Sequence, residues 1–305
     1  MDKLLTVVLL CHNRVQMAVE ALESIIAQTT TEFRLVVSDN STNEDLRARL
    51  AAEFPAIEVV SWYPGVPAFD HFNNVIAMID TRYFVMFHDD DLMEPEYVET
   101  ILERFRKHPS AAAIGTNAIP IDGSGTPRSD RHWFQGEPTG SDRIFVDQLS
   151  LLQQYLVVDR GGIAPFPSYA YNSELVRGLT MQYSVGRAYC DTVFLLEIMK
   201  RGPLIWIDKP LLRVRIHATN QSNLCAVRDY KIFVSWVKRE FGARVSRRHL
   251  DEYRLPRLYL ALANRHRFPA AALKYFLCAM PRLLVTSKSF RQRICRKLLG
   301  GGGAR

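Results

Sequence analysis

The chain has 305 residues, of which 48% are hydrophobic, and it carries a net charge of +7. A chain of this length and composition buries a sizeable core, which excludes a disordered protein. Its five cysteines are scattered, without a CxxC pair or a Cys/His cluster, so a reducing compartment is favoured over a disulfide framework. The apolar run Leu4–Leu10 is too short to span a bilayer and lacks a cleavage site after it. We interpret it as the first buried strand.

The charge is divided unevenly along the chain. Residues 1–224 contain 20 Lys and Arg against 28 Asp and Glu, whereas residues 225–305 contain 19 against 4. A mildly acidic body therefore precedes a strongly basic tail, which is typical of contact with a polyanionic surface. No zinc finger, RNP-type aromatic motif or GXXG loop accompanies the tail. We therefore expect no nucleic-acid partner.

The first half of the chain alternates short apolar runs with helical patterns. This alternation predicts an α/β fold with a mostly parallel sheet flanked by helices. The expected strands cover residues 6–10, 33–38, 57–62 and 83–87, with a strand pair around Pro210. The expected helices cover 15–28, 43–54 and 72–79, then start at Glu94–Pro95 and near Asp191, and only helical patterns follow Cys225. We predict one α/β domain over 1–222 and a basic helical C-terminal region over 223–305.

Three consecutive carboxylates, Asp89, Asp90 and Asp91, follow the apolar run 83–87 and His88. Ligands bind open α/β sheets at the carboxyl ends of strands. Like charges at such a place repel one another, and a divalent cation with substrate phosphate oxygens relieves the repulsion. The alternative is that these residues cap the following helix, but Glu94 and Pro95 already mark that helix start. The triplet therefore predicts a metal–diphosphate site.

Three further polar residues have two readings each. Asp39 ends the second strand, where a carboxylate binds ribose or base groups or closes an Asx-turn. Asp191 precedes an apolar helical stretch and is either its N-cap or a general base for a sugar hydroxyl. His217 follows a strand as either a structural imidazole or a metal ligand beside carboxylates.

The order of these residues resembles that of the family 2 glycosyltransferases, which have the GT-A nucleotide-sugar fold. The resemblance covers roughly residues 4–222 and is strongest at the first strand and the Asp triplet. It implies a divalent metal, Mn²⁺ or Mg²⁺, and an inverting transfer of a sugar from a nucleotide-diphosphate donor to an acceptor hydroxyl. The site residues that it implies are Cys11, His12, Asn13, Arg14, Asp39, Asn74, Asp89 and Asp90 for the nucleotide sugar, Asp89, Asp91 and His217 for the metal, and Asp191 as the catalytic base.

The biological setting stays more open. We expect a glycan or lipid-linked acceptor and a role in cell-surface polysaccharide synthesis, since family members often extend lipid-linked glycans. Residues 270–299 combine apolar and basic side chains, which favours a peripheral helix on the cytoplasmic face of a membrane. The alternative is a helical hairpin that packs on the catalytic domain with a solvated basic face. Residues 119–140 and 161–167 are expected to shape acceptor choice.

Two other functions compete with the transferase. A sugar nucleotidyltransferase would use a similar sheet, but it should carry a Gly-rich phosphate loop where this chain has Cys11–Arg14. A catalytically inactive sugar-binding or nucleotide-binding relative would use Asp191 only as a helix cap.

Overall fold

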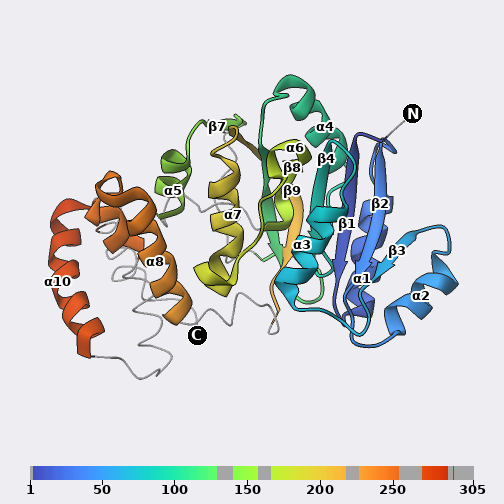
Figure 1. Ribbon diagram of the computed structural model, residues 1–305, viewed down its shortest axis with the longest axis horizontal. Helices are drawn as coiled ribbons and strands as arrows, with labels where there is room; N and C mark the ends of the chain where they lie inside the picture. The colour runs from blue at the N-terminus through green and yellow to red at the C-terminus, as the bar shows by residue number, and fades with distance from the viewer. Residues whose placement is uncertain are drawn as a thin grey trace.

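The computed structural model describes residues 3–128, 140–156, 166–217, 227–253, 270–287 and 291. In this part of the chain a nine-stranded sheet has the order β3-β2-β1-β4-β8-β6-β9-β5, and β7 pairs with β9 (Figure 1). The strands are β1 Leu5–Cys11, β2 Phe33–Asp39, β3 Glu58–Ser61, β4 Tyr83–His88, β5 Leu92–Met93, β6 Ala113–Ile121, β7 Arg143–Phe145, β8 Ala170–Asn172 and β9 Leu204–Arg215.

Most of the long strands point the same way. β1 runs parallel to β2 and β4, β2 runs parallel to β3, and β6 runs parallel to β9. The short β8 is antiparallel to both β4 and β6, so β6 and β9 share the direction of β1. The carboxyl ends of β1, β2, β4 and β9 therefore meet at one edge, where ligands bind in open α/β sheets.

Helices cover both faces of the sheet, because the central strands are apolar on both sides. The helices are α1 Val15–Ile26, α2 Asp45–Glu53, α3 Ala68–Met78, α4 Tyr97–Lys107, α5 Gln148–Leu156, α6 Ser173–Val176, α7 Cys190–Ile198, α8 Val227–Phe241 and α10 Ala270–Thr286. One core joins α1, α2 and α4 to Val7, Leu9 and Phe87. The other joins α3, α5, α7 and α8 to Val8 and Phe84. Successive strand residues thus serve opposite cores.

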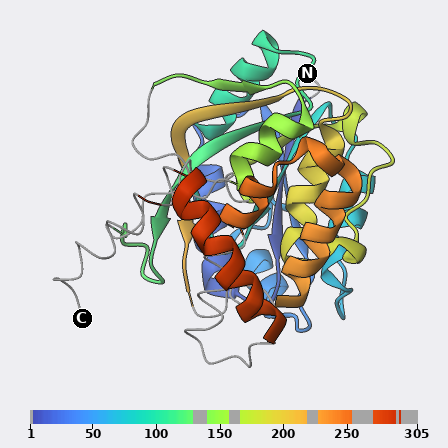
Figure 2. The same ribbon diagram turned by 90° about the vertical axis from the view of Figure 1, so that its left-hand side faces the viewer.

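The C-terminal helices pack onto the second core. Phe233 of α8 is fully buried and stacks on Tyr189, with ring centroids 4.5 Å apart. Residues 247–253 are helical, and Asp251 there pairs with Arg282 of α10 at 2.7 Å. Figures 1 and 2 show α10 as the outermost described helix, at the end of the molecule opposite β2 and β3. The domain boundary at 222 stays a prediction.

Three expectations about the elements were wrong. The strand pair around Pro210 is one strand of 12 residues, β9, whose pairing with β6 shifts register beside Pro210, because proline cannot donate to the ladder. The helix expected at Glu94–Pro95 begins at Tyr97, after a turn. The helix expected from 72 begins at Ala68. Of the two segments expected to shape acceptor choice, residues 119–121 belong to β6, and residues 129–139 and 161–165 lie outside the described chain.

Candidate active site

The carboxyl edge of the sheet brings together segments that are far apart in sequence. In the sheet register Cys11 lies opposite Asp39, and Leu10 lies opposite His88. The segment after β1, the turn after β2 and the Asp triplet after β4 are therefore neighbours. β9 ends at Arg215 on the same edge.

Asp89 is fully buried and is held by the segment that follows β1. Its Oδ2 accepts a hydrogen bond from the His12 backbone N–H at 2.9 Å, and its Oδ1 accepts one from Arg14 Nε at 3.0 Å and a second from the same guanidinium. The other arm of the Arg14 fork reaches Asp90 Oδ2 at 2.9 Å. Burial raises the pKa of Asp89, although Arg14 opposes this. Arg14 is 30% exposed, so its guanidinium borders solvent.

Asp90 also contacts His217, whose Nε2 lies 3.0 Å from the Asp90 Oδ2. Burial acts to raise the pKa of Asp90. The electrostatic interactions with His88, Arg14 and His217 outweigh burial and hold that pKa below its ordinary value. His217 thus lies against the triplet, as expected for a residue of this site.

Asp91 is bound by the end of β9. Its Oδ1 accepts a hydrogen bond from the Arg215 backbone N–H at 2.9 Å, and the Arg215 Nε donates to the Asp90 carbonyl at 2.9 Å. The same buried guanidinium donates to Glu20 at 2.7 Å and to the Gly123 carbonyl at 2.9 Å. Burial, and then the charge of Asp90, raise the pKa of Asp91 well above its ordinary value. The Arg215 N–H and the charge of Arg14 therefore only partly offset the burial of the Asp91 carboxyl and its repulsion by Asp90.

His88 is a site residue that the sequence reading missed. Its ring lies parallel to Phe72, with centroids 6.4 Å apart, and also contacts Phe166. Its Nε2 is buried and has no hydrogen-bond partner among the described residues. Ligand atoms of His88, Asp90 and Asp91 all lie within 4.8 Å of one another. This donor set, one imidazole and two carboxylates, suits a Mn²⁺-type ion.

The structure divides the predicted metal ligands. Asp91 belongs to the group that could hold a metal, whereas Asp89 turns its oxygens to Arg14 and His12, and His217 contacts Asp90. At Asp90, Arg14 and His217 contact only Oδ2, so a cation bound through Oδ2 would share it with them or displace them. The set of Asp89, Asp91 and His217 stays a prediction.

Beside the triplet, the segments after β1 and β2 are hydrogen-bonded to each other. Asn13, at φ 57°, donates its backbone N–H to Ser41 Oγ at 2.9 Å and accepts the Thr42 N–H at 2.9 Å. The His12 Nδ1 lies 2.7 Å from the Asn40 carbonyl oxygen. Cys11 is buried at the end of β1, and burial raises the pKa of its thiol well above the ordinary value. Cys11 is therefore a neutral thiol that packs at the end of this strand.

Asp39 adopts the Asx-turn that the sequence reading kept open. Its Oδ1 accepts the Ser41 N–H at 3.0 Å, and its Oδ2 lies 3.9 Å from Arg47 Nε. Next to it, Ser38 Oγ accepts a hydrogen bond from Trp62 Nε1 at 2.9 Å and lies 2.7 Å from His71 Nε2. Burial lowers the pKa of His71 to about 4, so the imidazole that is hydrogen-bonded to the Ser38 hydroxyl is neutral. This network fixes the strand end beneath the turn.

Asp191 is the second residue of α7. The N-cap is Tyr189, without a side-chain hydrogen bond, so the expectation that Asp191 caps the helix was wrong. Its Oδ1 instead accepts the Thr192 N–H at 2.7 Å. Because α7 leads into the start of β9, its first turn lies at the carboxyl edge of the sheet (Figure 1). Burial raises the pKa of Asp191.

Asn74 lies half-buried on α3, and no described side chain hydrogen-bonds to it. Its neighbour Asn73 instead holds Met181, accepting its N–H at 2.8 Å and donating to its carbonyl at 3.1 Å. The role expected for Asn74 near the donor stays a prediction.

This sheet, with a carboxylate triplet and basic groups at its carboxyl edge, defines an α/β protein of the GT-A type. The sequence profile of glycosyl transferase family 2 matches residues 6–165, just over half of the chain. The chain belongs to glycosyl transferase family 2. The match contains the Asp triplet and ends before α7 and β9.

Solved structures agree with the GT-A fold. S. aureus TarS, residues 1–349 in complex with UDP-GlcNAc, superposes with a TM-score of 0.64 at 13% identity, over 90% of this chain and 79% of that one. The same TarS fragment without a named ligand gives 0.62 at 14% identity, over 90% and 78%. Its UDP complex gives 0.61 at 14% identity, over 91% and 81%. No curated protein matches the sequence.

Proposed function

We propose that the chain transfers a sugar from a nucleotide-diphosphate donor to an acceptor hydroxyl, with inversion at the anomeric carbon. The observation that carries this proposal is the convergence of His12–Arg14, Asp39–Ser41 and Asp89–Asp91 at one sheet edge, joined by hydrogen bonds. The TarS structures with UDP and UDP-GlcNAc support a nucleotide sugar as the donor class.

The exposure and hydrogen bonds of Arg14 support a role in binding the diphosphate. Its guanidinium borders solvent and is already held in a two-pronged geometry by Asp89 and Asp90. Guanidinium forks match phosphate oxygens in the same bidentate way. We propose that Arg14 binds the leaving diphosphate, and that Asn13 and the Asp39 turn line the nucleotide pocket.

A divalent metal fits the donor atoms of this site. Asp90 and Asp91 supply oxygen ligands, and the unpartnered His88 nitrogen supplies the imidazole that Mn²⁺ accepts more readily than Mg²⁺. When bound, such an ion neutralises negative charge on the departing diphosphate. Asp91 is common to this group and to the set predicted from sequence, so it is the ligand to test first.

Asp191 is the proposed general base for the acceptor hydroxyl. Its raised pKa means that the carboxylate becomes protonated, and the base is lost, at a pH above the ordinary carboxyl value of about 4. We therefore expect kcat to fall on the acid side through a single ionisation above that value. The measurement is a kcat–pH profile of the wild-type chain with saturating donor. An acid limb at or below the ordinary carboxyl value would contradict the assignment.

The direct test of donor binding is thermal denaturation with a panel of nucleoside diphosphates, with and without Mn²⁺. A ligand that binds only the folded state raises the free energy of unfolding, by about 2.7 kcal/mol at a ligand concentration of 100 times its Kd, and therefore raises Tm. We expect one nucleoside diphosphate to raise Tm, and Mn²⁺ to increase that shift. Transfer or donor-hydrolysis assays then separate an enzyme from an inactive binding relative, and release of pyrophosphate would indicate a nucleotidyltransferase instead. No shift with any nucleotide would refute the proposal.

The C-terminal helix α10 bears on membrane attachment. Its Ala279 and Leu283 are buried, and Arg282 pairs with Asp251, so one face packs on the protein. Leu277, Leu284 and Val285 of the same helix are 63%, 39% and 78% exposed. None of the helices in the described part of the chain has the length and apolar character needed to cross a bilayer. We propose that this apolar face lies on an anionic membrane, helped by the net +15 charge of residues 225–305.

Replacing Leu277, Leu284 and Val285 together by serine should reduce binding to vesicles that contain anionic lipid, because this removes the apolar area that enters the interface. Flotation of the full chain with anionic and with neutral vesicles measures this. The matched control is Val146→Ser, which replaces an exposed apolar residue outside the C-terminal region and should leave flotation unchanged. If the wild-type chain does not float with anionic vesicles at low salt, the membrane proposal is wrong and the C-terminal helices only pack on the catalytic domain.

A further inference from the structure

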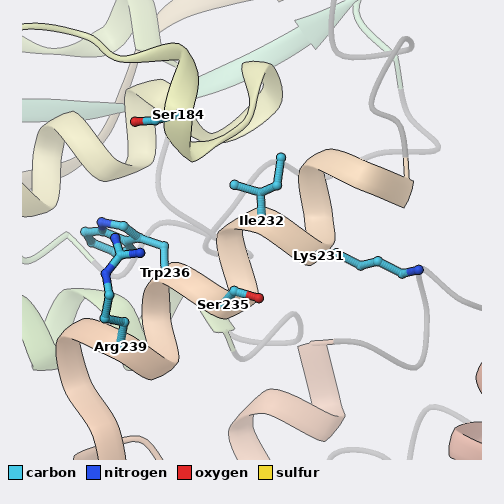
Figure 3. A pocket seen from close by; sticks show the side chains of 6 residues that line it. All are labelled: Ser184, Lys231, Ile232, Ser235, Trp236 and Arg239. Atoms are coloured by element: carbon cyan, nitrogen blue, oxygen red, sulfur yellow. The ribbon is translucent and has the colours of Figure 1, made fainter.

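A pocket separate from the Asp triplet lies between α8 and the short 3-10 turn Tyr183–Val185 (Figure 3). Its volume is about 250 Å³. Pockets for drug-sized ligands measure roughly 300–1,000 Å³, so this one suits a single sugar unit. It is lined by Ser184, Lys231, Ile232, Ser235, Trp236 and Arg239.

The lining combines the groups that recognise an anionic sugar. The Ser184 and Ser235 hydroxyls can bond sugar hydroxyls, and the Trp236 indole, which is 6% exposed, presents a small part of its ring. In Figure 3 the Arg239 guanidinium lies beside the Trp236 ring, while Lys231 extends towards the other end of the helix face. The Arg239 guanidinium favours a phosphate or carboxylate group, whereas the Lys231 ammonium points away from it and adds positive charge further along the helix.

The exposed side of α8 extends this positive charge. Arg228, Lys231, Lys238 and Arg239 are all exposed along it. The acidic residues of the helix weaken the charge only in part. Glu240 lies 3.2 Å from Arg239 Nε, and Asp229 is half-buried against Gly186, where an added Cβ would lie 3.0 Å from the Asp229 carbonyl oxygen. An anionic chain could therefore follow the helix.

The pocket is fixed relative to the proposed base. Ser184 precedes Asp191 by one short segment, which passes through Gly186 at φ 88° and Tyr189. Gly186 lies against α8, and the Tyr189 ring stacks on Phe233 at 4.5 Å and 12°. A ligand in the pocket would thus be held by the same rigid piece that carries Asp191. Figure 1 shows the start of α7 at the end of the molecule where the carboxyl ends of β1 and β4 lie.

We propose that this pocket is an acceptor subsite for a glycan unit that bears a negative charge, either a phosphate or a carboxylate. The proposal rests on the transferase function above and adds the chemical class of the acceptor. It places the charged group of that unit on Arg239, with Lys231 adding positive charge further along α8 and the hydroxyl that reacts directed towards Asp191.

Fluorine NMR of the full chain labelled with 5-fluorotryptophan tests the subsite, because the chain has four tryptophans and Trp236→Phe assigns the pocket signal. The probes are a hexose 6-phosphate, a hexuronic acid and a neutral methyl hexoside, each titrated with the best nucleoside diphosphate and Mn²⁺ at saturation. We expect at least one of the two anionic sugars to shift the Trp236 signal. The neutral sugar should leave that signal unchanged. Which anion shifts it distinguishes a phosphate-bearing from a carboxylate-bearing acceptor.

Arg239→Gln should weaken this binding about tenfold, as expected for loss of a charge-assisted contact, and Lys231→Gln should weaken it less, because it removes only a more distant charge. The control Lys107→Gln removes an exposed cation at the end of α4 and should change nothing. Equal shifts with neutral and anionic sugars, or none with any of them, would overturn the subsite while nucleotide binding in the same sample still supports the transferase. Absence of nucleotide binding would instead refute the transferase itself.

Discussion

Asp191→Asn is expected to lower kcat by about 10²–10⁴-fold, the usual worth of a general base. Asparagine keeps the oxygen that accepts the Thr192 N–H, so the first turn of α7 should remain folded. It lacks the basic carboxylate that takes the acceptor proton. Donor affinity should stay near the wild-type value, because the donor contacts proposed above come from β1, β2 and β4.

Steady-state kinetics with the acceptor, together with the thermal shift produced by the donor nucleotide, measure both parts of this expectation. The matched control is Glu197→Gln on the same helix, where the carboxylate pairs only with Lys200 in the described chain. It should keep kcat within a few-fold. If Asp191→Asn turns over at a near-normal rate, Asp191 is not the base.

Asp91→Asn is expected to lower Mn²⁺ affinity by about 100-fold or more. Mutation of a residue that only hydrogen-bonds to a metal ligand already lowers metal affinity by about 10–100-fold. The neutral amide keeps an oxygen for the Arg215 N–H. The raised pKa of Asp91 means that the metal-free fold disfavours its charge, and this penalty grows as pH rises through that pKa. The metal-free variant should therefore be at least as stable as wild type at pH 8, while the Tm increase given by Mn²⁺ is lost.

Electron paramagnetic resonance of Mn²⁺ and thermal denaturation with and without the ion measure these effects. Asp80→Asn is the control, since Asp80 is an exposed carboxylate that pairs with Arg34 away from the triplet. His88→Asn and His217→Asn, compared side by side, show which imidazole contributes a nitrogen to the ion. Wild-type Mn²⁺ affinity in Asp91→Asn would remove Asp91 from the metal site.

Much of the fold could be predicted because its signals are local. β1 and β4 are uninterrupted apolar runs, and the Asp triplet directly follows one of them, so both the strands and the edge that carries the site were predicted. β9 was predicted as a broken pair because Pro210 is a strong local signal. The pairing with β6 that absorbs this proline comes from a distant part of the chain.

The partners of the triplet show the same limit. Arg14 and His217 were expected at the site, and both contact it. The contacts of Arg215 and the position of His88 were not predicted. They depend on the face of the sheet to which each side chain points, and on the strand register, which the whole sheet sets. A histidine placed directly before the triplet was the one available signal. The network of Ser38, Trp62 and His71 likewise has no pattern in sequence, since its members come from three separate elements.

Arg215 connects four places: the backbone of Asp90, the carboxylate of Asp91, Glu20 on α1 and the turn at Gly123. The residues recognised by the family profile end at 165, fifty positions before it. A fragment cut at that limit would keep all three aspartates yet lose Arg215, whose backbone N–H binds Asp91 and whose side chain binds the Asp90 carbonyl, as well as Asp191 and His217. The smallest piece able to assemble the whole proposed site therefore reaches at least to His217, and shortened versions for crystallisation or activity work should be planned accordingly.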